Sequence, residues 1–366
     1  MKRIISLMII ACLLLCACGA APEETVAPTT TQQPTETTEA TTEATTVPVV
    51  TEPSVSNVNP LTGEALDAPY TGRPAAVSVN NIKACLPQFG ISQADMIYEI
   101  EAEGGITRLL AIFSDFTDIG TIGPVRSART FFNNVSASYD IPLIHCGGSS
   151  AATKGRYDKT HHLEKWEHID QMTNGSYFFR DKDRLSSGYA LEHTLFTTGE
   201  DMTKVLTEKK LNVAPEGGVN YGLQFADDVT LNGQAANKIK VSFRGKKTTS
   251  FTYDAQAGLY KASQYGKEHV DAGNNKETLA YKNVFVLLSE QTLHDEGKYT
   301  RSYYDLIGEG NGYFACNGQM ISIKWSRKTV TDPFVYTMED GTPLTLGVGT
   351  SYVAVVDIDA PKVTCE

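Results

Sequence analysis

Long hydrophobic runs and a surplus of positive charge are both absent from this 366-residue chain. No apolar run reaches the roughly 18 residues that a membrane-spanning helix needs, which excludes a polytopic membrane protein. Basic residues number 32 against 43 acidic ones, and the formal charge is −11. Because this balance disfavours sequence-independent binding to a polyanion, we expect no nucleic-acid partner. The hydrophobic content of 41% is typical of a globular protein with a sizeable core.

Cysteine spacing excludes the common zinc motifs. The seven cysteines include no CxxC pair and no cluster with zinc-ligand spacing, so we expect no metal and no cofactor. Four of them lie in the region that we expect to fold, where they allow three pairings or none: Cys85, Cys146, Cys316 and Cys365.

The N-terminus has the features of a secretory leader. Lys2 and Arg3 precede an apolar stretch at residues 4–15, and the sequence LCAC then ends in Cys18. Leu at −3, Ala at −1 and Cys at +1 resemble the lipobox of bacterial lipoproteins, whose cysteine is diacylated before cleavage. We therefore predict a lipoprotein signal peptide over residues 1–17. An ordinary secretory leader with an accidental cysteine is the alternative.

A lipidated Cys18 would fix where the protein resides. Diacylglycerol on its sulfur, with palmitate-like chains, would hold the protein at the membrane without a transmembrane helix. We therefore predict a lipid-anchored protein on the extracytoplasmic face of the cell membrane.

A polar, threonine-rich segment follows this cysteine. Residues 19–57 contain twelve Thr, five Pro and six Glu, with no aromatic residue, Lys or Arg. Such a segment buries too little apolar surface to offset the entropy of ordering, so we predict a disordered stalk over residues 18–57. As a coil it spans roughly 35 Å, enough to lift a folded region away from the membrane.

The folded region divides at a predicted linker over residues 207–220, which is rich in Pro and Gly. Residues 58–206 mix strands with helices, whereas residues 221–366 show short alternating runs separated by turns. The expected elements before the linker are strands at 75–80, 94–103, 106–113 and 141–146 and helices at 124–139 and 200–209; after it they are strands at 238–243, 250–254, 258–262, 284–288, 312–316, 320–325 and 351–356. The predicted fold class is α+β, with a mixed α/β N-terminal domain followed by a smaller, mostly antiparallel β domain.

Carboxylates are concentrated on one predicted strand. Glu99, Glu101 and Glu103 share a face of it, since alternate residues of a strand point the same way. The Gly104-Gly105 pair predicts a two-residue hairpin, which places Glu101 opposite Arg108. Carboxylates beside covered aliphatic residues suggest acid–base chemistry, with Glu99 and Glu101 as candidate catalytic groups. A solvated strand face with one cross-strand ion pair explains the same pattern.

Arginines lie at the start of the predicted helix at 124–139. Arg126, Arg129 and Asn133 form one stripe on it. Because arginine in a first helical turn opposes the helix dipole, we expect a negative partner there. That partner is either the glutamate face or an anionic ligand, and guanidinium groups suit phosphate and carboxylate well. We therefore predict a ligand site formed by Arg108, Arg126, Arg129 and Asn133, with a purely structural Glu–Arg network as the alternative.

A strand-to-turn passage supplies a further candidate. The predicted strand at 141–146 ends in His145 and Cys146 and runs into a turn at residues 147–150, whose sequence is GGSS. Successive backbone N–H groups in such a turn can bind an anion. His145 is therefore added to the predicted ligand-binding residues.

Several motifs point to a known family. They are NPLTG at 59–63, EAEGGITR at 101–108, GPVRSAR at 123–129, HCGGS at 145–149, FRD at 179–181, HTLF at 193–196, HVD at 269–271 and the run from Gly318 to Trp325. Together they resemble the YerB-like lipoproteins, although that family's usual His-Asn pair is His193-Thr194 here. The resemblance covers residues 59–357. It implies a two-domain extracytoplasmic lipoprotein of mainly Gram-positive bacteria with domains of unknown function, and no established activity.

Two functional classes remain. The first is a cell-envelope lipoprotein that binds an anionic wall component such as peptidoglycan, a lipid-linked wall precursor or a partner protein through its arginines. The second is a cell-envelope enzyme that uses the Glu/Arg cluster to cleave a glycan or to transfer a phosphoryl group. A simpler explanation is a network that only stiffens the fold. An open cleft would favour a ligand, and closed mutual pairing would favour the structural role.

Overall fold

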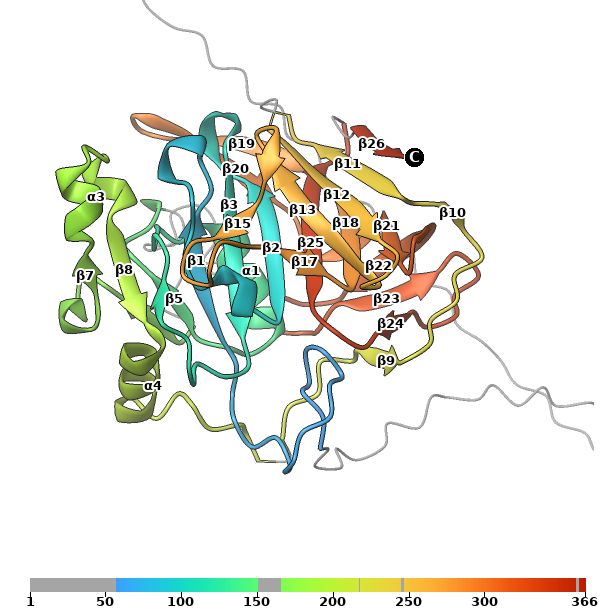
Figure 1. The fold of residues 1–366 in the computed structure, drawn as a ribbon, viewed down its shortest axis with the longest axis horizontal. Coiled ribbons are helices and arrows are strands. Elements are labelled where there is room, and N and C mark those ends of the chain that lie inside the picture. Colours follow the sequence, from blue (N-terminus) through green and yellow to red (C-terminus); the bar gives the residue numbers. More distant parts are fainter. Residues whose placement is uncertain (1–56, 151–165, 217, 245–246, 360–361) are drawn as a thin grey trace, which may run out of the picture. The chain divides into compact units, whose positions relative to one another are not determined.

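The computed structural model describes residues 57–150, 166–216, 218–244, 247–359 and 362–366. The predicted signal peptide, Cys18 and nearly all of the predicted stalk lie outside these residues. The described chain is mostly β (Figure 1). Its helices are α1 (Thr130–Ser138), α3 (Lys182–Ser186), α4 (Gly199–Glu208) and the 3-10 turns η1 (Lys83–Cys85), η2 (Ile91–Gln93), η3 (Glu103–Gly105), η5 (Gly175–Tyr177) and η6 (Leu191–His193). Each helix in these ranges is too short or too polar to cross a membrane.

One eleven-stranded sheet unites the regions before and after the predicted linker, here called the N-terminal and C-terminal halves. From the N-terminal half come β1 (Ala75–Asn80), β2 (Met96–Glu101), β3 (Thr107–Phe113), β5 (Leu143–His145) and β6 (His168–Asp170). From the C-terminal half come β10 (Gln234–Ala235), β18 (Asn283–Ser289), β21 (Gly308–Cys316), β22 (Gln319–Arg327), β23 (Val335–Met338) and β25 (Ser351–Asp357). The halves meet where β2 pairs with β25 in parallel, from Met96 beside Ser351 to Ile100 beside Val355.

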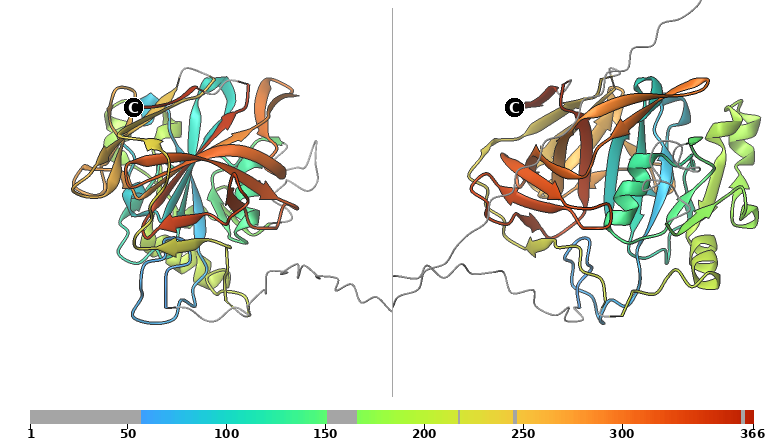
Figure 2. Two further views of the ribbon diagram at one scale, coloured as in Figure 1. Left: turned by 90° about the vertical axis from the view of Figure 1, so that its right-hand side faces the viewer. Right: turned by 180° about the vertical axis from the view of Figure 1, so that it is seen from behind.

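The remaining strands form smaller sheets. A six-stranded sheet contains β11 (Lys238–Ser242), β12 (Thr248–Asp254), β13 (Leu259–Gln264), β14 (Lys267–Glu268), β17 (Ala280–Tyr281) and β26 (Lys362–Cys365). A three-stranded sheet contains β4 (Thr121–Ile122), β7 (Phe179–Arg180) and β8 (Leu195–Thr198). The two-stranded sheets are β9 (Gln224–Ala226) with β24 (Thr345–Gly347), β15 (Val270–Asp271) with β16 (Glu277–Thr278), and β19 (Gln291–Glu296) with β20 (Tyr299–Tyr304). Figure 2 shows these sheets from two further sides.

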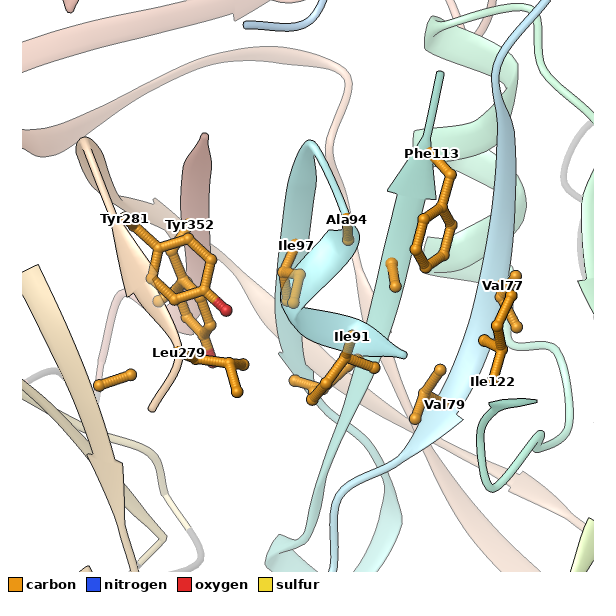
Figure 3. Close-up of a cluster of buried hydrophobic side chains, with 14 of the residues drawn as sticks. Val77, Val79, Ile91, Ala94, Ile97, Phe113, Ile122, Leu279, Tyr281 and Tyr352 are labelled. Atoms are coloured by element: carbon orange, nitrogen blue, oxygen red, sulfur yellow. The ribbon is translucent and has the colours of Figure 1, made fainter. Parts of the chain in front are cut away.

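Both faces of the central sheet are covered, which explains why β1, β2 and β3 are buried along their whole length. On one face, Tyr98 of β2 belongs to a cluster with Phe132 of α1. On the other face, Ile97 belongs to a cluster with Tyr281 and Tyr352 of the C-terminal half (Figure 3). Burying one large apolar side chain contributes about 1.5–3 kcal/mol. The two halves are therefore held together by apolar packing as well as by the shared sheet.

Most predicted strands are confirmed. In the N-terminal half these are β1, β2, β3 and β5, and in the C-terminal half they are β11, β12, β13, β18, β21, β22 and β25, all within a few residues of their predicted bounds. The helix predicted at 200–209 is α4. The α+β class is correct only in outline, because helices are few and the two expected domains contribute to one sheet.

The helix predicted at 124–139 is wrong at its start. The observed helix α1 begins at Thr130, with Arg129 as its N-cap. The preceding segment is held in extended form by backbone hydrogen bonds from Val125 N to Leu195 O at 2.7 Å and from Arg126 N to Ser78 O at 2.8 Å. These tertiary bonds override the helical pattern. Arg126 is therefore not on the helix, and the predicted stripe with Arg129 and Asn133 does not exist.

The hairpin between β2 and β3 also differs from the prediction. Ala102 N donates to Ile106 O at 2.7 Å, so three residues connect the strands instead of two. Two of them, Gly104 and Gly105, adopt the positive φ angles (69° and 73°) that favour glycine. Arg108 consequently lies beside Ile100. A shift of one residue turns side chains to the opposite face, so the predicted pair of Glu101 with Arg108 is wrong.

The buried carboxylate of Glu99 joins the two halves. Its side chain has no solvent exposure. Five groups donate to it: Asn81 Nδ2 (3.0 Å), Thr107 Oγ1 (2.6 Å) and Lys247 Nζ (3.0 Å) at Oε1, and Thr249 Oγ1 (2.6 Å) and the Tyr352 hydroxyl (2.6 Å) at Oε2. Burial raises the pKa of Glu99, but the Lys247 charge and the hydroxyl donors outweigh it and lower that pKa. Three of the five donors come from the C-terminal half.

Removing the lysine from this pair is expected to destabilise the protein strongly. In a Lys247→Met variant, the Glu99 carboxylate stays buried without its counter-charge, which costs about 3–5 kcal/mol of unfolding free energy. Urea unfolding measures this loss. The matched control is Lys261→Met, because Lys261 pairs with Asp254 at 2.7 Å but is 52% exposed. It is expected to cost far less, because solvent screens an exposed ion pair. Equal losses for the two variants would contradict a structural role for the Glu99–Lys247 pair.

Candidate functional site

Three arginines surround one glutamate at the turn after β2. Glu103 accepts hydrogen bonds from Arg108 Nη2 at 3.2 Å and from Arg129 Nε at 2.9 Å, and it also pairs with Arg129 Nη2 and with Arg301. Burial raises the pKa of Glu103, but the Arg129 hydrogen bond and the charges of Arg108 and Arg129 lower it far below its usual value. Three cations against one anion leave this group, here called the Glu103 cluster, with a surplus of positive charge.

The cluster is assembled from four separate elements. Glu103 lies in η3, Arg108 in β3, Arg129 at the N-cap of α1 and Arg301 in β20. Arg108 Nη1 donates to Ser127 O at 2.9 Å, which ties β3 to the extended segment before α1. Arg108 and Arg129 are almost completely buried. Because Arg108 and Arg129 are paired with Glu103 and closed off from solvent, both predicted ligand residues have a mainly structural role.

Arg301 was missed by sequence reasoning. It lies in the β19–β20 hairpin, whose strands alternate little in hydrophobicity, and both strands escaped the pattern search. The signal that could have found them is Gly297, which has a φ of 76° and stands between two strand-length runs, the second rich in Tyr. The Arg301 guanidinium also lies 4.5 Å from the ring centre of Tyr299.

Arg126 lies apart from this network, in an open cleft of about 380 Å³. The residues that line the cleft are Val125, Arg126, Cys146, Arg180, Leu191, Glu192 and Leu195. Arg126 Nη2 donates to Glu192 Oε2 at 3.2 Å, and Arg180 Nη1 donates to Leu191 O at 2.5 Å. The Arg126 side chain is 21% exposed. Arg180 was not among the predicted ligand residues, although its FRD motif was noted.

The electrostatic environment of the cleft is positive. Burial lowers the pKa of Arg108 most, and the charges of Arg129 and Arg126 lower it further, so Arg126 lies within electrostatic range of the Glu103 cluster. Two arginines, Arg126 and Arg180, line the cleft, and Arg126 is electrostatically coupled to Arg108 of the Glu103 cluster. Three acidic groups lie among them: Glu103, Glu192 and Asp170, the last of which raises the pKa of Cys146. Among the residues that line the cleft itself, two are arginines and one is a glutamate.

The predicted role of His145 is corrected by its surroundings. The side chain is completely buried, and Nδ1 lies 2.7 Å from the carbonyl oxygen of Gly147, which can only accept a proton. Nε2 therefore accepts from His168 Nδ1 at 3.0 Å. Burial lowers the pKa of His145 to about 4, so the ring is neutral at pH 7. It positions the glycine-rich turn and is not a cationic ligand for an anion.

The predicted catalytic pair is corrected in the same way. Glu99 and Glu101 are buried on one face of β2, with exposures of 0% and 4%. Five donors saturate Glu99, and its lowered pKa keeps it ionised, so it cannot deliver a proton to a substrate. Asn133 is also completely buried, within α1, and therefore lies away from solvent.

The cleft cysteine is a poor nucleophile. Cys146 is half-buried, and its Sγ donates to Gln171 Oε1 at 3.3 Å. Burial raises the pKa of this thiol, which keeps it protonated and unreactive at pH 7. Cys85, Cys316 and Cys365 are also free thiols, so the pairing alternatives left open by the sequence resolve to none among the described cysteines.

A motif of the C-terminal half positions the loop after β1. Asp271 Oδ1 accepts from Gly90 N at 2.9 Å, and its Oδ2 accepts from Ser92 N at 2.8 Å. His269 Nε2 lies 3.0 Å from Gln88 Oε1 in the same loop. These contacts give the HVD sequence a structural function between the two halves.

Comparisons with known proteins match both halves. The chain matches the "Protein of unknown function (DUF3048) N-terminal domain" over residues 61–212 and the corresponding C-terminal domain over residues 239–353. YerB of Bacillus subtilis (strain 168), which is named as a proposed lipoprotein, is 29% identical over 323 residues, or 83% of this chain and 91% of the relative. The crystal structure of the YerB protein from Bacillus subtilis matches with a TM-score of 0.69 and 29% identity, covering 84% of this chain and 99% of that one. The chain belongs to the YerB-like two-domain family.

This assignment confirms the resemblance inferred from the sequence motifs. Two of those motifs, EAEGGITR and GPVRSAR, supply Glu103, Arg108, Arg126 and Arg129 of the site. The two matched family domains correspond to the two halves, which nevertheless share the central sheet of this YerB-like protein.

Acid is expected to destabilise the fold between about pH 6.5 and pH 4. Burial lowers the pKa of His145 to about 4 and that of His269 to about 3, whereas both titrate near 6.5 in an unfolded chain. The unfolded chain therefore binds more protons in this window, so the stabilisation is complete above about pH 6.5 and declines as the pH falls. At about 1.4 kcal/mol per pKa unit, the loss amounts to several kcal/mol. Urea midpoints at pH 7.0 and 4.5 measure it.

A His269→Gln variant isolates the contribution of one histidine. Its amide retains a donor for Gln88 but does not titrate, so the difference between the two midpoints should shrink. A midpoint in the unsubstituted protein that stays constant or rises on acidification would contradict this explanation.

Proposed function

We propose that this YerB-like protein is a membrane-anchored lipoprotein of the bacterial cell envelope that binds a phosphate or carboxylate group in the Arg126–Arg180 cleft. The ligand class is an anionic wall component or a lipid-linked precursor. The lipobox at Cys18 and the lipoprotein name proposed for the relative support the anchor. The observation that carries the binding function is a pair of partly exposed guanidinium groups in an open cleft, with the Glu103 cluster behind them.

The geometry of the two arginines suits an anion. A guanidinium group presents a planar fork of donors that matches phosphate and carboxylate oxygens. Arg180 is held in place by its hydrogen bond to Leu191 O, and its side chain lines the cleft. The partner of Arg126, Glu192, is 51% exposed. An exposed pair of this kind contributes at most about 1 kcal/mol, so a ligand anion can displace it.

Binding without turnover is favoured over catalysis. A glycan-cleaving mechanism needs two accessible carboxyl groups on either side of the substrate. The predicted pair, Glu99 and Glu101, is buried, and Glu192 is already paired with Arg126. The glycan-cleaving version of the enzyme alternative therefore loses its proposed acid and base.

Anion binding is tested by calorimetric titration of inorganic phosphate and glycerol phosphate. The sample is the chain from residue 18 with Cys18→Ala, because an acyl chain on Cys18 would confuse the assay. Arg126→Gln and Arg180→Gln each remove a charge-assisted hydrogen bond, so each should weaken binding about 10- to 100-fold. The control is Lys240→Gln, an exposed cation on β11, which should change binding less than twofold.

A third substitution makes the test sharper. Glu192→Gln removes the carboxylate that competes for Arg126, so it should strengthen phosphate binding severalfold. The absence of measurable binding, or binding that is indifferent to both arginine substitutions, would overturn the proposed function.

A further inference from the structure

Exposed apolar side chains are concentrated in the segment that supplies Arg180 and Leu191 to the Arg126–Arg180 cleft. Ten large hydrophobic residues are exposed in the described chain, and four of them lie within the twenty residues from 172 to 191. They are Met172 (72% exposed), Phe179 (40%), Leu185 (42%) and Leu191 (60%). Leu191 lines the cleft itself, and Phe179 precedes the cleft residue Arg180. Figures 1 and 2 show α3, β7 and β8 together at one edge of the fold.

These side chains stay exposed because contacts to the core hold the backbone of α3 in place. Arg184, the buried residue of α3, donates to Cys85 O at 2.8 Å and to His193 O at 3.0 Å. Its guanidinium also lies 4.9 Å from the ring centres of Tyr189 and Phe196. Asp181 caps α3 by accepting from Arg184 N at 2.9 Å. Because α3 is bound to the core in this way, the adjacent Leu185 cannot turn inward without breaking these contacts.

The combination of charge and apolar surface indicates the kind of ligand. A soluble phosphate would use the two arginines and leave the four apolar side chains in water. A phospholipid in a membrane offers a phosphate for the cleft and, directly beneath it, an apolar boundary for the side chains around it. Exposed Leu, Phe and Met beside basic residues are typical of protein surfaces that lie on the membrane interface.

We propose that this face docks on the membrane, with a lipid phosphate in the Arg126–Arg180 cleft and with Phe179, Leu185 and Leu191 at the boundary of the acyl chains. The inference rests on the proposed function, because it uses the same cleft, and it names the lipid bilayer as the source of the anion. The predicted anchor makes even a weak contact effective, since tethering raises the local concentration to the order of millimolar.

Co-sedimentation with vesicles tests the docking. The chain from residue 18 with Cys18→Ala is mixed with phosphatidylglycerol–phosphatidylcholine vesicles or with pure phosphatidylcholine vesicles at 150 mM salt. We expect binding to the anionic vesicles at least tenfold tighter than to the neutral ones. A Phe179→Ser/Leu191→Ser variant should bind the anionic vesicles at least tenfold more weakly while its affinity for inorganic phosphate changes less than twofold. The control is Val335→Ser, which removes a residue of β23 that is 51% exposed and should change neither value.

The outcomes separate this inference from the proposed function. Phosphate binding without vesicle binding would overturn the docking and leave the anion site in place. Loss of both would overturn both proposals. Vesicle binding that is unchanged in the Phe179→Ser/Leu191→Ser variant would show attraction by charge alone and would overturn the docking. Arg126→Gln should weaken the binding of inorganic phosphate and of the anionic vesicles. If it weakens neither, the two ligands do not share this cleft.

Discussion

The buried carboxylate of Glu99 is the interaction on which the rest of the structure depends. It lies at the junction where β2 of the N-terminal half pairs with β25 of the C-terminal half. A charge without solvent is tolerated there only because Lys247 and four neutral donors satisfy it from both halves. The sheet supplies the backbone pairing across this junction, and Glu99 adds a polar contact that only the correct register can form.

The positive site is built on this junction and depends on both halves. Glu103 follows β2 directly, so the strand that carries Glu99 also positions the centre of the arginine cluster. Arg301 reaches Glu103 from β20 of the C-terminal half, whereas the cleft residues Arg126 and Arg180 belong to the N-terminal half. The surplus of positive charge in an acidic chain is thus a product of tertiary structure, which the composition alone conceals.

Local patterns predicted the strands well and the site only in part. Buried β3 was evident from its continuous apolar run, and the Glu103–Arg129 contact follows the expected attraction between the two motifs. The predicted pairing register of β2 with β3 was wrong because a three-residue turn resembles a two-residue turn in sequence. The helix start at 130, the role of Lys247 and the contribution of Arg301 all depend on contacts between distant segments, which no local pattern encodes. The pairing of both halves in one sheet also depends on contacts between distant segments, so local patterns did not predict it.

The most direct test of this account is whether the two halves unfold together. The chain has one tryptophan in each half, Trp166 and Trp325, so Trp325→Phe and Trp166→Phe variants each leave a single fluorescent reporter. Urea unfolding of each variant is followed by its fluorescence and by far-UV circular dichroism. A continuous sheet joined at Glu99 predicts that the two signals change in one coincident transition in both variants. Separate transitions, with one half still folded after the other has unfolded, would contradict it.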